Sequence, residues 1–225
     1  MSFYAIAIDG PSGAGKSTMA KRLAKDLGFL YVDTGAIYRT VGLSALRQGV
    51  SPGDAPAVLA LLPALTITTD YASDGLQHMY LNGEDVTEAI RQHEVSDAAS
   101  QVSAIPGVRD YLLDMQRRFA RENNVVMDGR DIGTVVLPEA RVKIFLTAQP
   151  EARARRRFDE LTKRGQQAVY EQVLQDVIDR DYRDSHRSAA PLKRAQDAVE
   201  VDTTHLSLEE SLERLFQLVK ERLEL

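Results

Sequence analysis

Short apolar runs alternate with stretches of helical periodicity along most of the chain. Tyr4–Asp9 is an apolar run that leads into a glycine-rich turn, and the residues from Lys16 to about Leu27 then follow a helical pattern. Runs rich in Val and Ile that are separated by helices are typical of a parallel sheet covered on both faces. We therefore predict an α/β protein with a parallel sheet whose strands are Tyr4–Asp9, Phe29–Asp33, Val125–Asp128, Val142–Leu146 and Ala198–Asp202.

One segment departs from this rhythm. Leu65–Thr69 and Leu76–Leu81 alternate apolar and polar residues, with Ser73–Gly75 between them. Asn82-Gly83 supplies a second turn signal, and an Asn-Gly pair beside alternating residues is typical of a tight β-hairpin. The pattern predicts a small antiparallel insertion between helical flanks.

The glycine-rich turn after the first strand matches the pattern G-x-x-x-x-G-K-[ST] in full. Its glycines let backbone N–H groups turn inward around phosphate oxygens, and the start of the next helix adds partial positive charge. Lys16 is expected to reach the β- and γ-phosphates of ATP. The residues predicted to hold the ATP phosphates are Gly10, Pro11, Ser12, Gly13, Ala14, Gly15, Lys16, Ser17 and Thr18.

A carboxylate closes another predicted strand. The segment Val125–Asp128 is apolar until its last residue, which is the arrangement expected of the Walker B acid that holds Mg²⁺. We predict Ser17 and Asp128 as the Mg²⁺ ligands, the alternative being that Asp128 only forms the turn before Gly129. GTPases share the phosphate-binding loop, but their Asn-Lys-x-Asp segment is absent from this sequence, so that class is disfavoured.

An apolar helical stripe near the C-terminus turns charged. Val173 and Val177 share one face of a predicted helix, and steps of three and four extend that face to Arg180, Asp184 and Arg187. Buried arginines require anions, and one carboxylate cannot satisfy all of them, so the stripe predicts an external anion. The alternative is a solvated helix face with internal ion pairs.

A second group of arginines lies at Arg153, Arg155, Arg156 and Arg157, after a predicted strand and a Pro-Glu helix start. It could be a nucleic-acid patch, a solvated helix face or a lid that closes over a triphosphate. No aromatic platform interleaves with these arginines, which disfavours nucleic acid. A lid fits best, because phosphoryl transfer requires water to be excluded and developing charge to be neutralised.

Composition narrows the choice further. The chain has 225 residues, a net charge of −5 and no cysteine, so thiolate chemistry is excluded and a basic nucleic-acid surface is not indicated. The longest apolar run, Ala57–Leu65, contains Pro63 and is far shorter than the roughly 20 residues of a membrane span. The first residues lack the pattern of a signal peptide. We expect a soluble, cytoplasmic monomer with no membrane or nucleic-acid partner.

Four segments together resemble the bacterial cytidylate kinase family, a group of nucleoside monophosphate kinases. These segments are Ile8–Ser17, Asp33–Arg39, Asp128–Thr134 and Arg180–Arg187, and the likeness includes the insertion near residues 64–95. The resemblance implies one domain with a five-stranded parallel P-loop core, an antiparallel insertion and a short helical lid. Its parts would be the core (residues 1–33, 96–148 and 190–225), the monophosphate-binding region (about 34–95) and the lid with acceptor-contacting helices (about 149–189).

The resemblance also implies roles for single residues. Thr34 would lie near the acceptor, and the acceptor phosphate would be held by Arg39, Arg130 and Arg187. Cytosine would be read by Ser100, Arg109 and Asp131, and the sugar would be contacted by Arg180 and Asp184. The groups implied to act on the transferring phosphoryl are Lys16, Arg130, Arg157 and Arg183.

The implied activity is transfer of the γ-phosphoryl group of ATP to CMP or dCMP, with Mg²⁺ as cofactor and small nucleotides as the only partners. No nucleophile is needed beyond the acceptor phosphate, so catalysis would depend on positioning and charge neutralisation. One alternative is a P-loop kinase for another small acceptor, such as UMP, AMP, shikimate or gluconate. Another is a nucleotide sensor without turnover, which the presence of Lys16, Ser17 and Asp128 disfavours.

Overall fold

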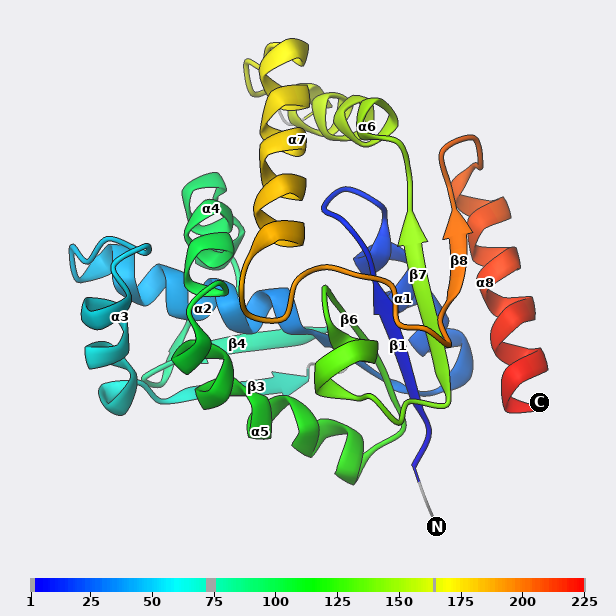
Figure 1. The fold of residues 1–225 in the computed structure, drawn as a ribbon, viewed down its shortest axis with the longest axis horizontal. Helices are drawn as coiled ribbons and strands as arrows, with labels where there is room; N and C mark the ends of the chain where they lie inside the picture. The colour runs from blue at the N-terminus through cyan, green and yellow to red at the C-terminus, as the bar shows by residue number, and fades with distance from the viewer. Residues whose placement is uncertain (1–2, 72–75, 164, 225) are drawn as a thin grey trace.

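The computed structural model describes residues 3–71, 76–163 and 165–224 and has a five-stranded parallel sheet at its centre (Figure 1). The strand order is β2-β6-β1-β7-β8. All five predicted strands are confirmed to within one residue at each end: β1 (Ala5–Asp9), β2 (Leu30–Asp33), β6 (Val125–Gly129), β7 (Val142–Thr147) and β8 (Val199–Asp202). The order places β1, which leads into the phosphate-binding loop, between β6 and β7.

The register brings three carboxylates to one edge of the sheet. Asp33 at the end of β2 is opposite Asp128 of β6, and Asp9 at the end of β1 is opposite Gly129. Parallel strands place their carboxyl ends at the same edge, which is where ligands bind in open α/β sheets. The functional site is therefore expected at this edge.

The alternation of side chains along β1 explains the two covered faces. Ile6 and Ile8 belong to a buried cluster with helices α1 (Lys16–Leu27) and α8 (Leu208–Leu223), whereas Ala7 points into a second cluster on the opposite face. That second cluster packs against α5 (Pro106–Glu122). Successive residues of a strand face opposite sides of the sheet, so one apolar run supplies both cores.

The antiparallel insertion is a three-stranded sheet of β3 (Ile67–Tyr71), β4 (Gln77–Leu81) and β5 (Glu84–Asp85). The Asn82-Gly83 turn is confirmed, with positive φ angles of 52° and 86° that suit a tight hairpin. The turn predicted at Ser73–Gly75 lies outside the described residues. The strand β5 was not predicted, because its two acidic residues carry no apolar alternation.

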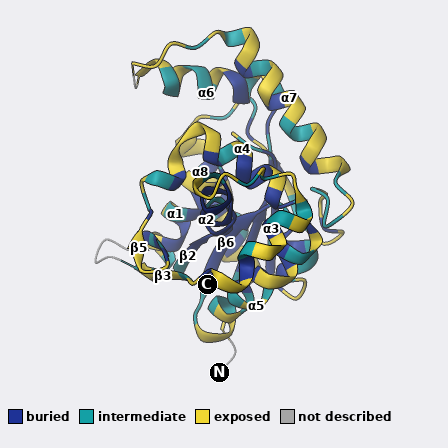
Figure 2. Ribbon diagram, turned by 90° about the vertical axis from the view of Figure 1, so that its left-hand side faces the viewer, coloured by how far each residue is buried: buried dark blue, intermediate teal, exposed yellow. Residues whose placement is uncertain are grey.

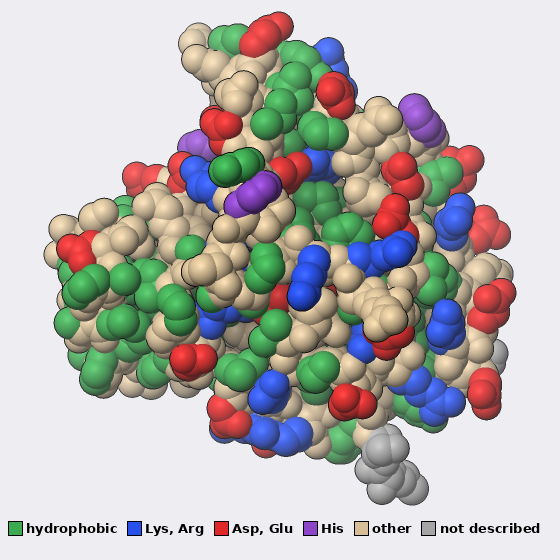
Figure 3. Space-filling model, viewed as in Figure 1, with side chains coloured by type: hydrophobic (Ala, Val, Ile, Leu, Met, Phe, Trp, Pro, Cys, Tyr) green, Lys and Arg blue, Asp and Glu red, His purple; other side chains and the backbone are tan. Residues whose placement is uncertain are grey.

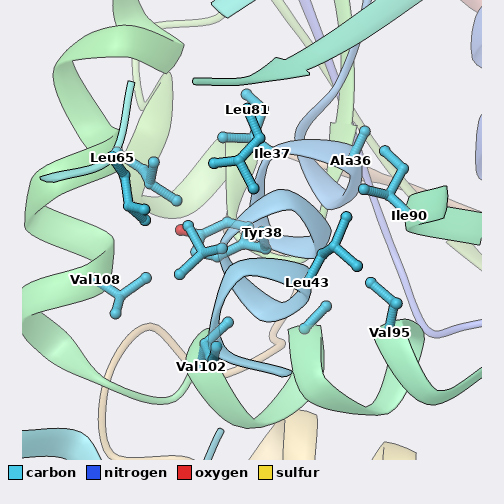
Figure 4. Packing of buried hydrophobic residues seen from close by; sticks show 14 of the residues in the cluster. Ala36, Ile37, Tyr38, Leu43, Leu65, Leu81, Ile90, Val95, Val102 and Val108 are labelled. Carbon is cyan, nitrogen blue, oxygen red and sulfur yellow. The ribbon is translucent and has the colours of Figure 1, made fainter. Parts of the chain in front are cut away.

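The insertion packs with helices α2 (Thr34–Arg47), α3 (Ala55–Leu61), α4 (His93–Val102) and α5 around a hydrophobic core of its own. Figure 4 shows Ile37, Leu43 and Val95 converging in this core, with Tyr38 among them. Hydrophobic side chains also gather on the outer surface over α3 (Figure 3), where Leu59 is exposed. This half of the molecule is thus a packed unit beside the parallel sheet.

Helices α6 (Pro150–Lys163) and α7 (Tyr170–His186) stand beyond the carboxyl edge of the sheet (Figures 1 and 2). Their shared buried cluster is small, with Ala154, Val173 and Val177 at its centre. Within residues 3–71, 76–163 and 165–224, no helix has both the length and the apolar character that crossing a bilayer requires.

Candidate active site

The phosphate-binding loop connects β1 to α1 at the carboxyl edge of the sheet. Gly10 has a φ of 152°, and a Cβ there would lie 1.9 Å from the carbonyl oxygen of Leu146, so only glycine fits. The Lys16 ammonium is buried and donates to the carbonyl oxygen of Pro11 at 2.7 Å. Burial and the neighbouring charge of Arg130 lower the pKa of Lys16, although Asp128 and Asp184 act in the opposite direction. An anionic phosphate near this lysine would favour its charged form.

The predicted metal ligands lie side by side. The Ser17 hydroxyl donates to one carboxylate oxygen of Asp128 at 3.0 Å, and the Tyr31 hydroxyl donates to the other at 2.8 Å. Burial and the nearby carboxylate of Asp33 raise the pKa of Asp128 to about 6. A cation could therefore bind at the buried carboxylate of Asp128, which lies near that of Asp33. A residue that only formed the turn before Gly129 would not need such an environment.

The residues at the start of α2 are tied to these carboxylates. Asp33 caps the helix by accepting from the backbone N–H of Ala36 at 2.9 Å, and it accepts from Arg39 at 2.8 Å. The Thr34 hydroxyl donates to the backbone oxygen of Asp128 at 2.8 Å. Gln77 of β4 accepts from the backbone N–H of Asp33 at 2.8 Å, which joins the insertion to this point.

A buried ion pair between Arg109 and Asp131 lies deeper on the same side. Arg109 also donates to the carbonyl oxygen of Ser103 at 3.1 Å, and its guanidinium lies 5.5 Å from the ring centre of Tyr38. The hydroxyl of Ser100 is buried and has no hydrogen-bond partner among the described residues. Together these groups offer donors and an acceptor to a flat polar ligand.

The charged stripe of α7 is confirmed as a buried face. Val173, Val177 and Asp184 are all buried, and Arg180 and Arg187 are partly covered. Asp184 accepts from the Nε of Arg130 at 2.8 Å, so its direct partner comes from the loop after β6 and not from the stripe. The stripe therefore meets the body of the protein at the loop after β6.

The fold leaves guanidinium groups of this cluster incompletely satisfied. Arg180 donates from Nη1 to Ser96 at 3.0 Å, and Arg187 donates from Nη1 to Ser103 at 3.0 Å. Three buried nitrogens, however, have no hydrogen-bond partner within the described part of the chain: Arg39 Nε, Arg180 Nε and Arg187 Nη2. Of these, Arg187 Nη2 has a longer ionic contact of 3.7 Å with Asp131. Unpaired buried donors are costly, so this cluster fits a polyanionic ligand.

The electrostatics of the cluster agree with that conclusion. Burial and the charge of Arg130 lower the pKa of Arg180 to about 10. Burial and Arg109 likewise lower the pKa of Arg187. Burial alone would raise the pKa of Asp184, but Arg130 and Arg180 outweigh it and keep that carboxyl ionised. Positive charge thus exceeds what the local carboxylates neutralise.

The arginines of α6, and Arg183 of α7, have different environments. Arg157 and Arg183 are partly exposed and pair with surface acids, Glu160 at 3.1 Å and Asp97 at 3.0 Å. Arg153 is buried, donates to the carbonyl oxygen of Ser12 at 2.9 Å and pairs with Asp181 of α7. This group is therefore not uniformly a lid that faces the ligand, because Arg153 links the phosphate-binding loop to both helices.

One cavity of about 1020 Å³ is lined by most of these groups. The predicted site residues that line it are Ser12, Gly13, Gly15, Lys16, Ser17, Thr18, Thr34, Arg39, Ser100, Arg109, Asp128, Arg130, Asp131, Arg157, Arg180, Arg183, Asp184 and Arg187. Gly10, Pro11 and Ala14 are not in its lining and shape the loop from beneath.

Sequence reasoning did not identify Asp9, Tyr31, Tyr38 and Gln77 as parts of this site. Asp9 carried the same signal as Asp128, since both are carboxylates that end an apolar strand. Its two oxygens accept from the backbone N–H groups of Ile132 and Gly133. The pKa of Asp9 is raised to about 6, chiefly by burial. The other three residues lacked a sequence signal, because their contacts join distant segments.

A phosphate-binding loop, a buried acid beside its hydroxyl and arginines across one cavity define a P-loop phosphotransferase. The family described as cytidylate kinase matches residues 6–221. A cytidylate kinase of Caldicellulosiruptor bescii is 51% identical over 213 residues, covering 95% of this chain and 94% of the relative. A cytidylate kinase of Geobacter sulfurreducens is 49% identical over 217 residues, covering 96% and 93%.

The chain therefore belongs to the cytidylate kinase family, and this membership identifies it as an ATP-dependent nucleoside monophosphate kinase. Among solved structures, a shikimate kinase from Bacteroides thetaiotaomicron aligns with a TM-score of 0.50 at 18% identity, covering 99% of each chain. That likeness concerns the P-loop kinase fold alone.

Proposed function

We propose that this protein transfers the γ-phosphoryl group of ATP to CMP or dCMP, giving ADP and CDP or dCDP. The observation that carries the proposal is the buried Arg109–Asp131 pair in the same cavity as the phosphate-binding loop. Cytosine needs a donor facing N3 and O2 and an acceptor facing the N4 amine. Arg109 supplies the donor and Asp131 the acceptor, with the Ser100 hydroxyl available beside them.

The other site residues take the roles that the family resemblance implies, and their places in the lining of one cavity support those roles. Arg39, Arg130 and Arg187 hold the acceptor phosphate, and Arg180 with Asp184 contacts the sugar. Lys16 stabilises the charge that spreads over the transferring group, together with Arg130, Arg157 and Arg183. Because the acceptor phosphate is already an anion, catalysis here consists of positioning and charge neutralisation.

The oxygen donors Ser17 and Asp128 fit a divalent cation such as Mg²⁺, which prefers carboxylates and hydroxyls together with nucleotide phosphates. Support comes from the raised pKa of Asp128, because a cation would remove the strain of a buried negative charge. A cation held by Ser17 and Asp128 would supply neutralisation of the negative charge on the nucleotide phosphates. The chain's own part is to hold the Asp128 carboxylate with Tyr31 and Ser17.

The test is ADP production with ATP and five acceptors: CMP, dCMP, UMP, AMP and shikimate. We expect kcat/KM for CMP or dCMP to exceed that for UMP by about tenfold or more, since one good base contact discriminates by about 1–3 kcal/mol. Activity with AMP and shikimate should be lower still. A preference for any of the other three acceptors would overturn the proposal.

A further inference from the structure

Two backbone N–H groups of one turn point at a single buried carboxylate. The turn Ile132–Val136 follows directly after Arg130 and Asp131, and the N–H groups of Ile132 and Gly133 each donate to Asp9 at 2.7 Å. The two bonds use both oxygens of the carboxylate. Asp9 is only 4% exposed, so water does not compete for these bonds.

The main chain of Asp9 is held independently of its side chain. Asp9 lies in the central strand β1, opposite Gly129 of β6 and Phe145 of β7. Its side chain then reaches the segment that carries the acceptor-facing residues. A change of the side chain should therefore disturb the turn while the start of the phosphate-binding loop stays fixed in the sheet.

We propose that Asp9 is a positioning residue that fixes the Arg130–Asp131 segment, and thereby sets the preference for a cytosine acceptor. This inference rests on the proposed function. Asp131 immediately precedes the anchored N–H groups, and its carboxylate pairs with Arg109 at the base subsite. Arg130 pairs with Asp184 on α7, so the same anchor also directs the arginine beside the acceptor phosphate.

The chemistry of the anchor requires an ionised carboxylate. A carboxylate accepts with both oxygens, and bonds to a charged acceptor at the start of a turn are stronger than neutral ones. An amide has one accepting oxygen and presents its NH₂ group to the second N–H. Asp9→Asn therefore keeps the size of the side chain but loses one bond, and Asn should tilt the turn.

The chain offers a matched control at the other end of the same turn. Arg117 of α5 donates to the carbonyl oxygens of Val136 at 3.0 Å and Val135 at 2.9 Å. Arg117→Met removes these two bonds from the same turn but leaves both bonds to Asp9 in place, as well as the bonds from the Val135 and Val136 N–H groups to the carbonyl oxygen of Asp131. It separates general weakening of the turn from loss of the anchor next to the base subsite.

The experiment compares wild type, Asp9→Asn and Arg117→Met by steady-state kinetics with CMP and UMP, together with KM for ATP and a melting curve. We expect Asp9→Asn to lower kcat/KM for CMP by about tenfold or more, since small misplacements of reacting groups cost up to about 10²-fold. The CMP-to-UMP ratio should fall by about fivefold or more, and KM for ATP should stay within about twofold. Arg117→Met should leave the ratio unchanged.

An unchanged CMP-to-UMP ratio in Asp9→Asn overturns the proposal, and so does an equal fall of the ratio in Arg117→Met. If Asp9→Asn does not fold, Asp9→Ser, whose hydroxyl can accept from one N–H, replaces it. Failure of both variants to fold would make Asp9 a folding residue and also overturn the proposal. A wild-type enzyme without CMP preference would instead refute the proposed function, so the two failures are distinguishable.

Discussion

At the scale of single residues, the Asp131 carboxylate is the acceptor group of the proposed base subsite. Asp131 is nearly buried and pairs with Arg109, so its carboxylate has a fixed direction and remaining acceptor capacity. A carboxylate accepts from the N4 amine of cytosine but repels the O4 carbonyl of uracil. In the proposed function, the choice of base thus depends on whether this one side chain can donate.

Asp131→Asn tests that choice directly. The asparagine amide can rotate to donate to O4 of uracil, so we expect the CMP-to-UMP ratio of kcat/KM to fall by roughly 10-fold, the effect of losing about 1.4 kcal/mol of base discrimination. Steady-state kinetics with both acceptors measures the ratio, and circular dichroism verifies folding. A folded variant with the wild-type ratio would remove Asp131 from base recognition.

The raised pKa of Asp128 predicts that the free energy of unfolding depends on pH. Its pKa in the folded protein is raised to about 6 from 3.8, so the folded state binds the proton more tightly than the unfolded state does. The free energy of unfolding should therefore fall as pH rises from about 4 to about 6, by on the order of 3 kcal/mol, and level off above.

Asp128→Asn cannot ionise, so the Tm of this variant should exceed that of wild type at pH 7.5 without metal and approach it at pH 5. Millimolar Mg²⁺ with ADP should stabilise wild type more than the variant at pH 7.5, because only the carboxylate is a strong ligand. Melting curves at both pH values provide the data. Equal pH profiles for the two proteins would count against a strained Asp128 carboxylate.

At the scale of elements, α7 has one buried face, which carries the residues proposed to contact the acceptor. Asp184→Ala removes the partner of Arg130 within a cluster that is otherwise cationic. We expect KM for CMP and dCMP to rise by about 10-fold or more, the equivalent of roughly 1.4 kcal/mol, while KM for ATP changes little. The Tm should also fall, because an unpaired buried charge is destabilising.

Glu171→Ala on the exposed first turn of the same helix is the control, and its effect should stay within about 0.5 kcal/mol. Kinetics with both acceptors and a melting curve for each variant separate the two helix faces. If Asp184→Ala leaves acceptor KM at the wild-type value, α7 does not face the nucleotide.

Periodicity predicted the elements but not their partners. Helix α1 begins at Lys16 and ends at Leu27 as expected, because the glycine-rich loop precedes it and Gly28 closes it in a left-handed conformation. The stripe of α7 was visible because three- and four-residue steps reveal a buried face. Its bond to Arg130 was not, because 54 residues separate the pair and no local pattern records that distance. Strand β5 was missed since its pairing with β4 is set by the hairpin turn alone.

At the scale of the whole molecule, the protein has separate hydrophobic cores. The half of the molecule that contains the insertion has a large core around α2, while α6 and α7 share a small cluster. Elements with few buried apolar contacts open locally at little free-energy cost. Helices α6 and α7 should therefore move as a unit on the rigid sheet.

Two matched Val→Ala substitutions test this difference. Val95 is fully buried in the large core around α2 and the insertion, and its replacement should cost about 2 kcal/mol of global stability and lower Tm. Val177→Ala, in the α6–α7 cluster, should change Tm by less than about 2 °C but speed amide hydrogen exchange in both helices. Addition of ATP and CMP should slow amide hydrogen exchange in α6 and α7 again. Equal Tm losses in the two variants would indicate one cooperative unit.

The enclosed arginine cluster also has a consequence for rates. The chain as a whole carries a net charge of −5, yet the cavity holds unsatisfied guanidinium groups. Beyond a Debye length of about 8 Å at physiological salt, an approaching nucleotide does not sense those groups. Capture is then a short-range event, so the association rate should depend weakly on ionic strength. The time a nucleotide remains bound should also depend on it weakly, because ion pairs inside a buried cavity are screened much less than exposed ones.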